Sequence, residues 1–311
     1  MPALHLDTDI GGDIDDLCAL ALVLAWPGAE LLGVTTVADD GGRRAGYARH
    51  ALMLAGRAGV PAAAGADVSL GCYSPVPGFP ERDDAYWPEP VRPAPGTHDE
   101  ALALLEESIG RGAAVAAVGP FTNLALVEKR SPGLLRDARL FLMGGYLFPT
   151  REGFPRWDFA DDWNVQVDPA SALYVLERSS PTLVPVSVTT ETWLRRAQLP
   201  ALRGAGPLSR LVARQAEAFA VDELEKAGYG PACAGLPDDF INFQHDPLTC
   251  AVALGWDDGV EVAELPVVSW VEGGLLRQRV EEGGRLTRVV TGVDGARFSE
   301  FWLDALTAAR I

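Results

Sequence analysis

The chain has 311 residues, with 26 lysines and arginines against 43 aspartates and glutamates, so its formal net charge is −17. An acidic protein of this kind repels polyanions, which argues against a nucleic-acid partner or an anionic membrane surface. Hydrophobic residues make up 48 % and charged residues 22 % of the chain, which is typical of a globular protein that buries a core and excludes a disordered chain.

The beginning of the chain predicts no secretory leader, because MPALHLDTDIGGD has no basic segment and reaches acidic residues at once. No run of about 18 apolar residues occurs that could span a membrane. The four cysteines lie far apart and form no CxxC pair, which is typical of reduced thiols: Cys18, Cys72, Cys233 and Cys250. We therefore expect a cytoplasmic protein.

Short apolar runs typical of strands alternate with helical patterns along most of the chain. The predicted strands are Ala3–Leu6, Glu30–Val37, Pro61–Ala64, Ala113–Val118, Ala138–Met143 and Leu183–Val188. The predicted helices are Leu17–Leu24, Arg44–Leu54, Glu100–Ile109, Asn123–Lys129, Pro169–Glu177, Leu208–Ala227 and Leu248–Leu254. This alternation predicts an α/β fold with a mostly parallel central sheet flanked by helices.

The last fifty residues have a different pattern. Gly273–Gly274 and Gly283–Gly284 separate short apolar runs that predict antiparallel strands, and a closing helix follows at Phe298–Arg310; the runs are Val260–Glu264, Val267–Val271, Leu275–Val280 and Thr287–Val290. No repeat or linker interrupts the chain, so we expect one catalytic domain over residues 1–311. The irregular stretch Ser69–Pro95 is either a functional loop such as a lid or a surface excursion without a role.

An acidic cluster follows the first predicted strand directly, in the segment LDTDIGGDIDD: Asp7, Asp9, Asp13, Asp15 and Asp16. Ligands of parallel sheets bind outside the carboxyl ends of the strands, and crowded carboxylates attract hard cations such as Ca²⁺ or Mg²⁺. The cluster could instead cap the next helix, form a solvated turn, or hold a phosphotransfer aspartate. The spacing does not match an EF-hand loop.

Three other segments carry polar groups at comparable places. They are Gly119–Asn123 after the fourth predicted strand, Asp162–Asn164 ahead of Asp168-Pro169, and His245–Pro247 at the start of a helix. Each alone is consistent with a turn, a helix cap or a buried histidine.

Together with the acidic cluster, these segments resemble the inosine–uridine-preferring nucleoside hydrolase family in order and spacing. The matching segments are DTDIG…DD (Asp7–Asp16), VTTVADD (Val34–Asp40), GPFTNLA (Gly119–Ala125), MGG (Met143–Gly145), DDWN…DP (Asp161–Pro169) and HDPL (His245–Leu248). The resemblance implies a mostly parallel α/β fold, a bound Ca²⁺, hydrolysis of the N-glycosidic bond of ribonucleosides, and a homodimer or homotetramer.

The resemblance also implies roles for individual residues. A Ca²⁺ ion would be held by Asp9, Asp16, Asp246 and the backbone carbonyl of Thr122, and Asp9 would act as general base. His245 would be the acid near the leaving base. The substrate would contact Asp15, Asp40, Asp162, Trp163 and Asn164. These roles suit a reaction that passes through an oxocarbenium-like state, which requires an activated water on one face of the sugar.

The chain departs from the family pattern at several positions. Gly12–Ile14 add length to the acidic segment, Asp40 stands where many members have asparagine, and Asp162 where glutamate is usual. Asp40 and Asp162 keep open the alternative that the substrate is a modified or non-nucleoside N-glycoside. A catalytically silent relative that binds nucleosides or sugars is a further alternative, against which the presence of every expected metal ligand argues.

Overall fold

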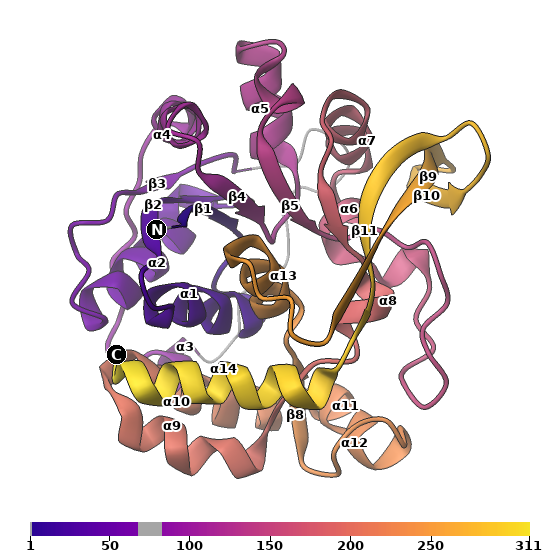
Figure 1. The fold of residues 1–311 in the computed structure, drawn as a ribbon. Coiled ribbons are helices and arrows are strands. Elements are labelled where there is room, and N and C mark those ends of the chain that lie inside the picture. The colour runs from indigo at the N-terminus through magenta and orange to yellow at the C-terminus, as the bar shows by residue number, and fades with distance from the viewer. Residues whose placement is uncertain (1, 68–82) are drawn as a thin grey trace.

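A computed structural model of the chain describes residues 2–67 and 83–311. In this part of the chain, nine strands form one sheet in the order β10-β9-β11-β6-β5-β4-β1-β2-β3 (Figure 1). The strands are β1 (Ala3–Thr8), β2 (Glu30–Thr36), β3 (Ala62–Ala64), β4 (Ala114–Ala117), β5 (Arg139–Met143), β6 (Thr182–Val184), β9 (Val260–Glu272), β10 (Leu275–Val280) and β11 (Arg285–Val293). Strands β1 to β6 are parallel to one another. Strand β9 is antiparallel to both of its neighbours, β10 and β11.

Helices cover both faces of the sheet, as Figure 1 shows. On one side lie α4 (His98–Gly110), α5 (Thr122–Arg130) and α7 (Pro169–Arg178). On the other lie α1 (Asp15–Ala25) and α13 (His245–Leu254), with α14 (Gly295–Ala309), α9 (Leu199–Ala205) and α10 (Pro207–Asp222) outside them. The remaining α-helices of the described residues are α2 (Arg43–Leu54), α3 (Asp83–Tyr86), α6 (Trp163–Val167), α8 (Val186–Thr189), α11 (Leu224–Ala227) and α12 (Tyr229–Ala232).

The side-chain alternation of the strands divides the apolar interior into two main cores. Along β4, Ala114 and Ala116 pack with the core around α1 and α13, whereas Val115 and Ala117 pack with the core around α4, α5 and α7. Because successive strand residues point to opposite faces, a strand that is covered on both faces reads as a continuous apolar run. This is why the AAVAAV segment could be recognised as a buried strand.

The predicted fold class is confirmed, including the antiparallel strands near the C-terminus. Most element ends differ by one to three residues, and predicted elements are divided or joined differently at three places. The runs Val260–Glu264 and Val267–Val271 belong to the single strand β9. Strand β6 ends at Val184, because Pro185 precedes the short helix α8. The predicted helix to Ala227 is interrupted at Glu223, whose backbone is not helical (φ −104°, ψ 58°).

Two strands were not predicted. Strands β7 (Trp193–Arg195) and β8 (Phe240–Phe243) pair antiparallel in a separate small sheet. Among the described cysteines, Cys18 and Cys250 are buried free thiols and Cys233 is a partly exposed one; Cys72 lies outside the described residues, as does most of the predicted loop Ser69–Pro95. None of the described helices is long and apolar enough to cross a bilayer.

Candidate active site

A cavity of about 910 Å³ opens at the carboxyl ends of β1, β4 and β5. Each of these strands contributes a residue just beyond or at its end: Asp9, Val118 and Met143. The first turns of α1 and α13 form another part of the lining, and α6 and the α10–α11 segment contribute further side chains. The ligand cavity therefore lies where a parallel sheet is expected to place it.

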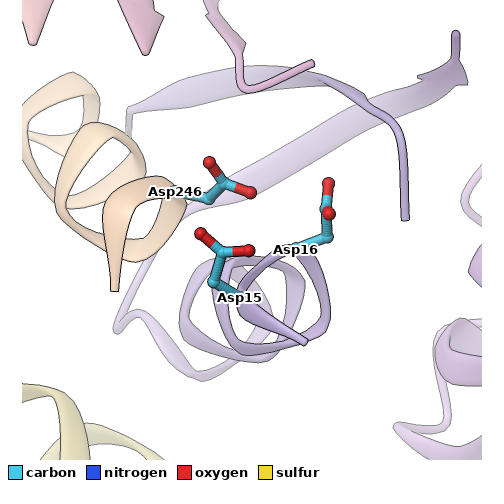
Figure 2. A group of neighbouring side chains, drawn as sticks. All are labelled: Asp15, Asp16 and Asp246. Carbon is cyan, nitrogen blue, oxygen red and sulfur yellow. The ribbon is translucent and has the colours of Figure 1, made fainter. Parts of the chain in front are cut away.

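Three buried carboxylates converge in this cavity (Figure 2). Asp15 and Asp16 lie in the first turn of α1 and Asp246 in the first turn of α13. One oxygen atom of each lies within 4.8 Å of the others. Both helices direct the positive ends of their dipoles at this point, which favours negative charge. Thr8, the last residue of β1, donates a hydrogen bond from its hydroxyl to Asp16 and fixes that side chain.

The electrostatics of this group favour a cation. Burial raises the pKa of Asp15, Asp16 and Asp246 well above the ordinary value, and the neighbouring carboxylates raise it further. Oxygen ligands from carboxylates are those that Ca²⁺ and Mg²⁺ take. A cation would remove the mutual repulsion and restore the ionised form, so this donor set fits a hard divalent metal.

Asp9 lies beside these carboxylates but outside their closest group. Its Oδ2 atom accepts a hydrogen bond from Trp163 Nε1 at 3.3 Å. Its backbone carbonyl accepts one from the fully buried Arg44, whose Nε also donates to the carbonyl of Ala38 at 2.8 Å. Burial raises the pKa of Asp9, while the Arg44 guanidinium and the Trp163 hydrogen bond lower it in part. Asp9 is thus held in a fixed position within the cavity, where it can take up a proton.

Asp162 and Asn164 also line the cavity and are both buried. Asp162 accepts hydrogen bonds from the backbone of Gly145 at 2.5 Å and Val165 at 3.4 Å, so it caps α6 and ties it to the end of β5. Burial raises the pKa of Asp162 to about 7. Asn164 donates from Nδ2 to the carbonyl of Val118 at 2.9 Å.

Aromatic rings surround His245 at another part of the cavity. The imidazole lies 5.7 Å from the ring of Trp157 at an interplanar angle of 29°, and 5.2 Å from the ring of Phe243. Its Nδ1 forms a hydrogen bond of 2.6 Å with the hydroxyl of Thr189. Burial among these groups lowers the pKa of His245 to about 3, so the ring is neutral at physiological pH. Flat apolar walls of this kind suit a planar ligand.

An ion pair joins two further segments at the cavity. The Lys226 ammonium of α11 donates to Asp13, which precedes α1, and lies 5.1 Å from the centre of the Phe219 ring. Asn242 of β8 donates to the other Asp13 oxygen. Burial tends to lower the pKa of Lys226, but Asp13 outweighs it and the net shift is upward. The pKa of Asp13 falls because Lys226 outweighs the effect of burial, so both partners are ionised.

The structure brings most of the predicted site residues to this cavity, and two lie elsewhere. Asp40 is exposed and outside the cavity lining, whereas the adjacent Asp39 is buried and accepts hydrogen bonds from the backbone of Arg44 (2.8 Å) and Ala45 (2.9 Å). The structure therefore does not support Asp40 as a substrate contact.

Thr122 is also absent from the cavity lining. Its hydroxyl donates to Asp168 at 2.7 Å and joins the starts of α5 and α7. The residue of this segment that lines the cavity is Val118, so its carbonyl replaces that of Thr122 as the backbone candidate. Sequence reasoning also missed Arg44 and Lys226, for which no motif gave a signal.

Buried carboxylates that fit a cation, a fixed aspartate and an aromatic wall thus lie together in one cavity of the α/β fold. The chain belongs to the inosine-uridine preferring nucleoside hydrolase family, whose model matches residues 4–300. Members of this class hydrolyse N-glycosidic bonds, and the predicted family is confirmed.

Individual relatives agree with this assignment. The chain is 29 % identical over 303 residues to the pyrimidine-specific ribonucleoside hydrolase RihA of Salmonella schwarzengrund (strain CVM19633), covering 94 % of this chain and 89 % of the relative. The fold is similar to a purine-preferring ribonucleoside hydrolase from Gardnerella vaginalis (TM-score 0.79, 22 % identity, 99 % of both chains). It is also similar to the plant nucleoside hydrolase PpNRh1 (TM-score 0.76, 20 % identity, 99 % of both chains).

Proposed function

We propose that the protein hydrolyses the N-glycosidic bond of ribonucleosides, releases the free base and ribose, and depends on Ca²⁺. The observation that carries the proposal is the convergence of Asp15, Asp16 and Asp246 beside Asp9 in one cavity. The family membership supports the reaction class, and the names of the curated relatives support ribonucleosides as substrates.

The proposed reaction breaks the bond between C1′ of the ribose and a nitrogen of the base. Positive charge then builds up on the sugar, as in glycoside hydrolysis, and a water must add to the exposed face. When bound, Ca²⁺ supplies positive charge that makes a water more acidic and attracts the ribose hydroxyls. Asp16 and Asp246 would hold it, with Asp9 and Asp15 as further carboxylate ligands.

Asp9 would take the proton of the attacking water, because its carboxylate lines the cavity and is fixed by Trp163. Asp15, Asp162 and Asn164 would contact the hydroxyl groups of the sugar, and Trp163 would cover one of its sides. Hydrogen bonds from buried groups can strengthen as the ring flattens and charge develops.

We keep His245 as the proposed acid at the leaving base. Burial lowers the pKa of its ring to about 3, so this role requires that the ring gain a proton when metal and substrate are bound. His245 also forms part of the flat wall that would receive the base, together with Trp157 and Phe243.

The test is a substrate panel assayed for release of reducing sugar. The panel contains purine and pyrimidine ribonucleosides, a deoxynucleoside and a nitrophenyl riboside, each assayed as purified, after exhaustive chelation, and after return of Ca²⁺ or Mg²⁺. We expect ribonucleoside hydrolysis that chelation abolishes and Ca²⁺ restores. Activity that survives chelation would refute the calcium proposal. Nucleoside binding without turnover would indicate a silent relative. Turnover of the nitrophenyl riboside alone, an O-riboside with a good leaving group, would show that the site cleaves ribosides but that the standard nucleosides are not its substrates, as expected if the natural substrate is a modified or non-nucleoside N-glycoside.

A further inference from the structure

Lysine is rare in this chain, and one of its lysines lines the cavity. Of the 26 basic residues only Lys129 and Lys226 are lysines, and all others are arginines. Lys129 lies on α5 over the ring of Tyr174, away from the cavity. Lys226 lines the cavity, on the short helix that follows the interruption at Glu223.

The structure holds the Lys226 ammonium in place from two sides. Asp13 binds it by an ion pair, and the Phe219 ring lies 5.1 Å from its nitrogen. Asp13 is itself fixed by Asn242 and by the backbone amide of Ile14. The side chains of Lys226 and Asp13 each keep 28 % of their surface exposed. A long flexible side chain is thereby pre-organised at the cavity surface, which lowers the entropy cost of using it.

Two cationic side chains line the cavity among the described residues, and they are engaged differently. The Arg44 guanidinium donates to the backbone carbonyls of Ala38, Asp9 and Ile10 and so belongs to the support of Asp9. Lys226 is held through Asp13, and an ammonium carries three N–H donors. His245 packs between the rings of Trp157 and Phe243, and its Nδ1 is engaged with the hydroxyl of Thr189. Lys226 is therefore the cavity-lining cation best placed to act on a bound group.

We propose that Lys226 is the residue that receives the departing base: its ammonium donates a hydrogen bond to an acceptor atom of the base and stabilises the negative charge that develops there. The inference rests on the proposed function, since it assigns a role within that reaction. It goes beyond the family assignment, because Lys226 lies outside the six segments that carry the resemblance and its ion-pair partner Asp13 belongs to the added segment Gly12–Ile14.

The chemistry balances without a further reactant. When the bond to C1′ breaks, its electron pair stays on the base nitrogen, and in uracil or hypoxanthine the charge spreads to a carbonyl oxygen that can face Lys226. The hydroxyl of the water bonds to C1′, and the second proton of that water goes to Asp9. The base takes a proton from His245 or, after departure, from solvent, which balances the proton that Asp9 later returns.

The test compares leaving groups in the full-length enzyme loaded with Ca²⁺. The variants are Lys226→Met, which keeps the length and removes the charge, Lys226→Arg, which keeps the charge, and Lys129→Met as the control lysine. We expect Lys226→Met to lower kcat for uridine or inosine by about 10²-fold, the usual loss when one donor to a developing negative charge is removed. For nitrophenyl riboside, kcat should fall less than about tenfold, because nitrophenolate is a stable anion that leaves without a hydrogen-bond donor. Lys226→Arg should recover part of the loss on uridine.

Equal losses on both substrates would overturn the inference, because they would mean that Lys226 only holds α11 and Asp13 in place. A second measurement does not depend on turnover. Reductive methylation of the native protein, followed by mass spectrometry of the peptides, reports the exposure of both lysines. Free uracil or hypoxanthine should protect Lys226 and leave Lys129 unchanged; no protection at a saturating base concentration would also overturn the inference. If the wild-type enzyme cleaves no riboside, the proposed function fails, and base protection still tests Lys226 independently.

Discussion

Replacement of Asp246 by asparagine should change the thermal stability in opposite directions with and without calcium. In the metal-free protein, burial and the carboxylates of Asp15 and Asp16 raise the pKa of Asp246, so its charge opposes folding. Asparagine fills the same space without that charge. With calcium present, the negative charge of Asp246 stabilises the protein because it binds the ion. Its removal therefore weakens calcium binding.

The size of both effects can be worked out. A ligand at about 100 times its Kd stabilises a protein by about 2.7 kcal/mol. With an unfolding entropy of about 2.1 cal/mol/K per residue, the 311 residues give about 650 cal/mol/K, so calcium should raise the Tm of the wild type by about 4 °C. Release of one poorly compensated buried charge is worth about 1–3 kcal/mol, which corresponds to an increase of about 2–5 °C for metal-free Asp246→Asn.

Scanning calorimetry of both proteins at about pH 8, in chelator and in excess calcium, measures these shifts. Asp99→Asn is the matched control, because Asp99 also lies in the first turn of a helix but is exposed and 3.5 Å from Arg130. This control should change little in either buffer. If Asp246→Asn lowers the Tm equally with and without calcium, Asp246 serves to stabilise the start of α13 and the reasoning about a cation site is wrong.

Three further predictions concern individual groups. Asp9→Asn should weaken calcium binding, and at a calcium concentration that fills the site it should still lower kcat by about 10²-fold or more, because base catalysis contributes at least that much; normal turnover of the metal-loaded variant would exclude Asp9 as the base. Burial raises the pKa of Asp7 and Asp162 to about 7, so the folded state takes up protons there before the unfolded state does. The metal-free protein should therefore gain about 1–2 kcal/mol as the pH falls from about 8 to 6.5, measured by denaturant unfolding, and a loss of stability over that interval would contradict the assignment. The kcat–pH profile should show no ionisation of His245 near its ordinary pKa of 6.5, because its folded value is about 3; if an ionisation seen there disappears in His245→Asn, the neutral-ring description is wrong.

The sheet could be predicted because its strands carry a strong local signal. Runs such as AAVAAV are buried on both faces and therefore apolar throughout, whereas β7 and β8 are three and four residues long and include polar or charged positions. The boundary errors have backbone causes. The apolar pattern of the sequence runs on past Pro185 and Glu223, although the strand ends before Pro185 and the helix is interrupted at Glu223. Where the backbone changes direction depends on tertiary contacts, which the apolar pattern does not contain.

The site could be predicted where its residues are close in sequence and not where they converge from distant segments. Asp15 and Asp16 were evident from the local crowding of acids. The sequence analysis named Asp40, whereas the buried carboxylate is that of Asp39, which follows a turn at Ala38 whose φ of 52° lies in the left-handed region. Arg44 and Lys226 reach the cavity only through the packing of α2 and α11, for which a single sequence offers no signal.

The position of the three clustered carboxylates along the chain has a consequence for folding. Asp15 and Asp16 emerge near the start of synthesis, but Asp246 belongs to α13, and β11, which joins β6 to β9, follows later still. A growing or truncated chain that lacks Asp246 has only two of the three clustered carboxylates. It should gain no free energy of folding from calcium, since stabilisation requires a ligand that prefers the native state. Calcium would thus stabilise only a chain that is nearly complete. An N-terminal fragment would remain susceptible to proteolysis at any calcium concentration.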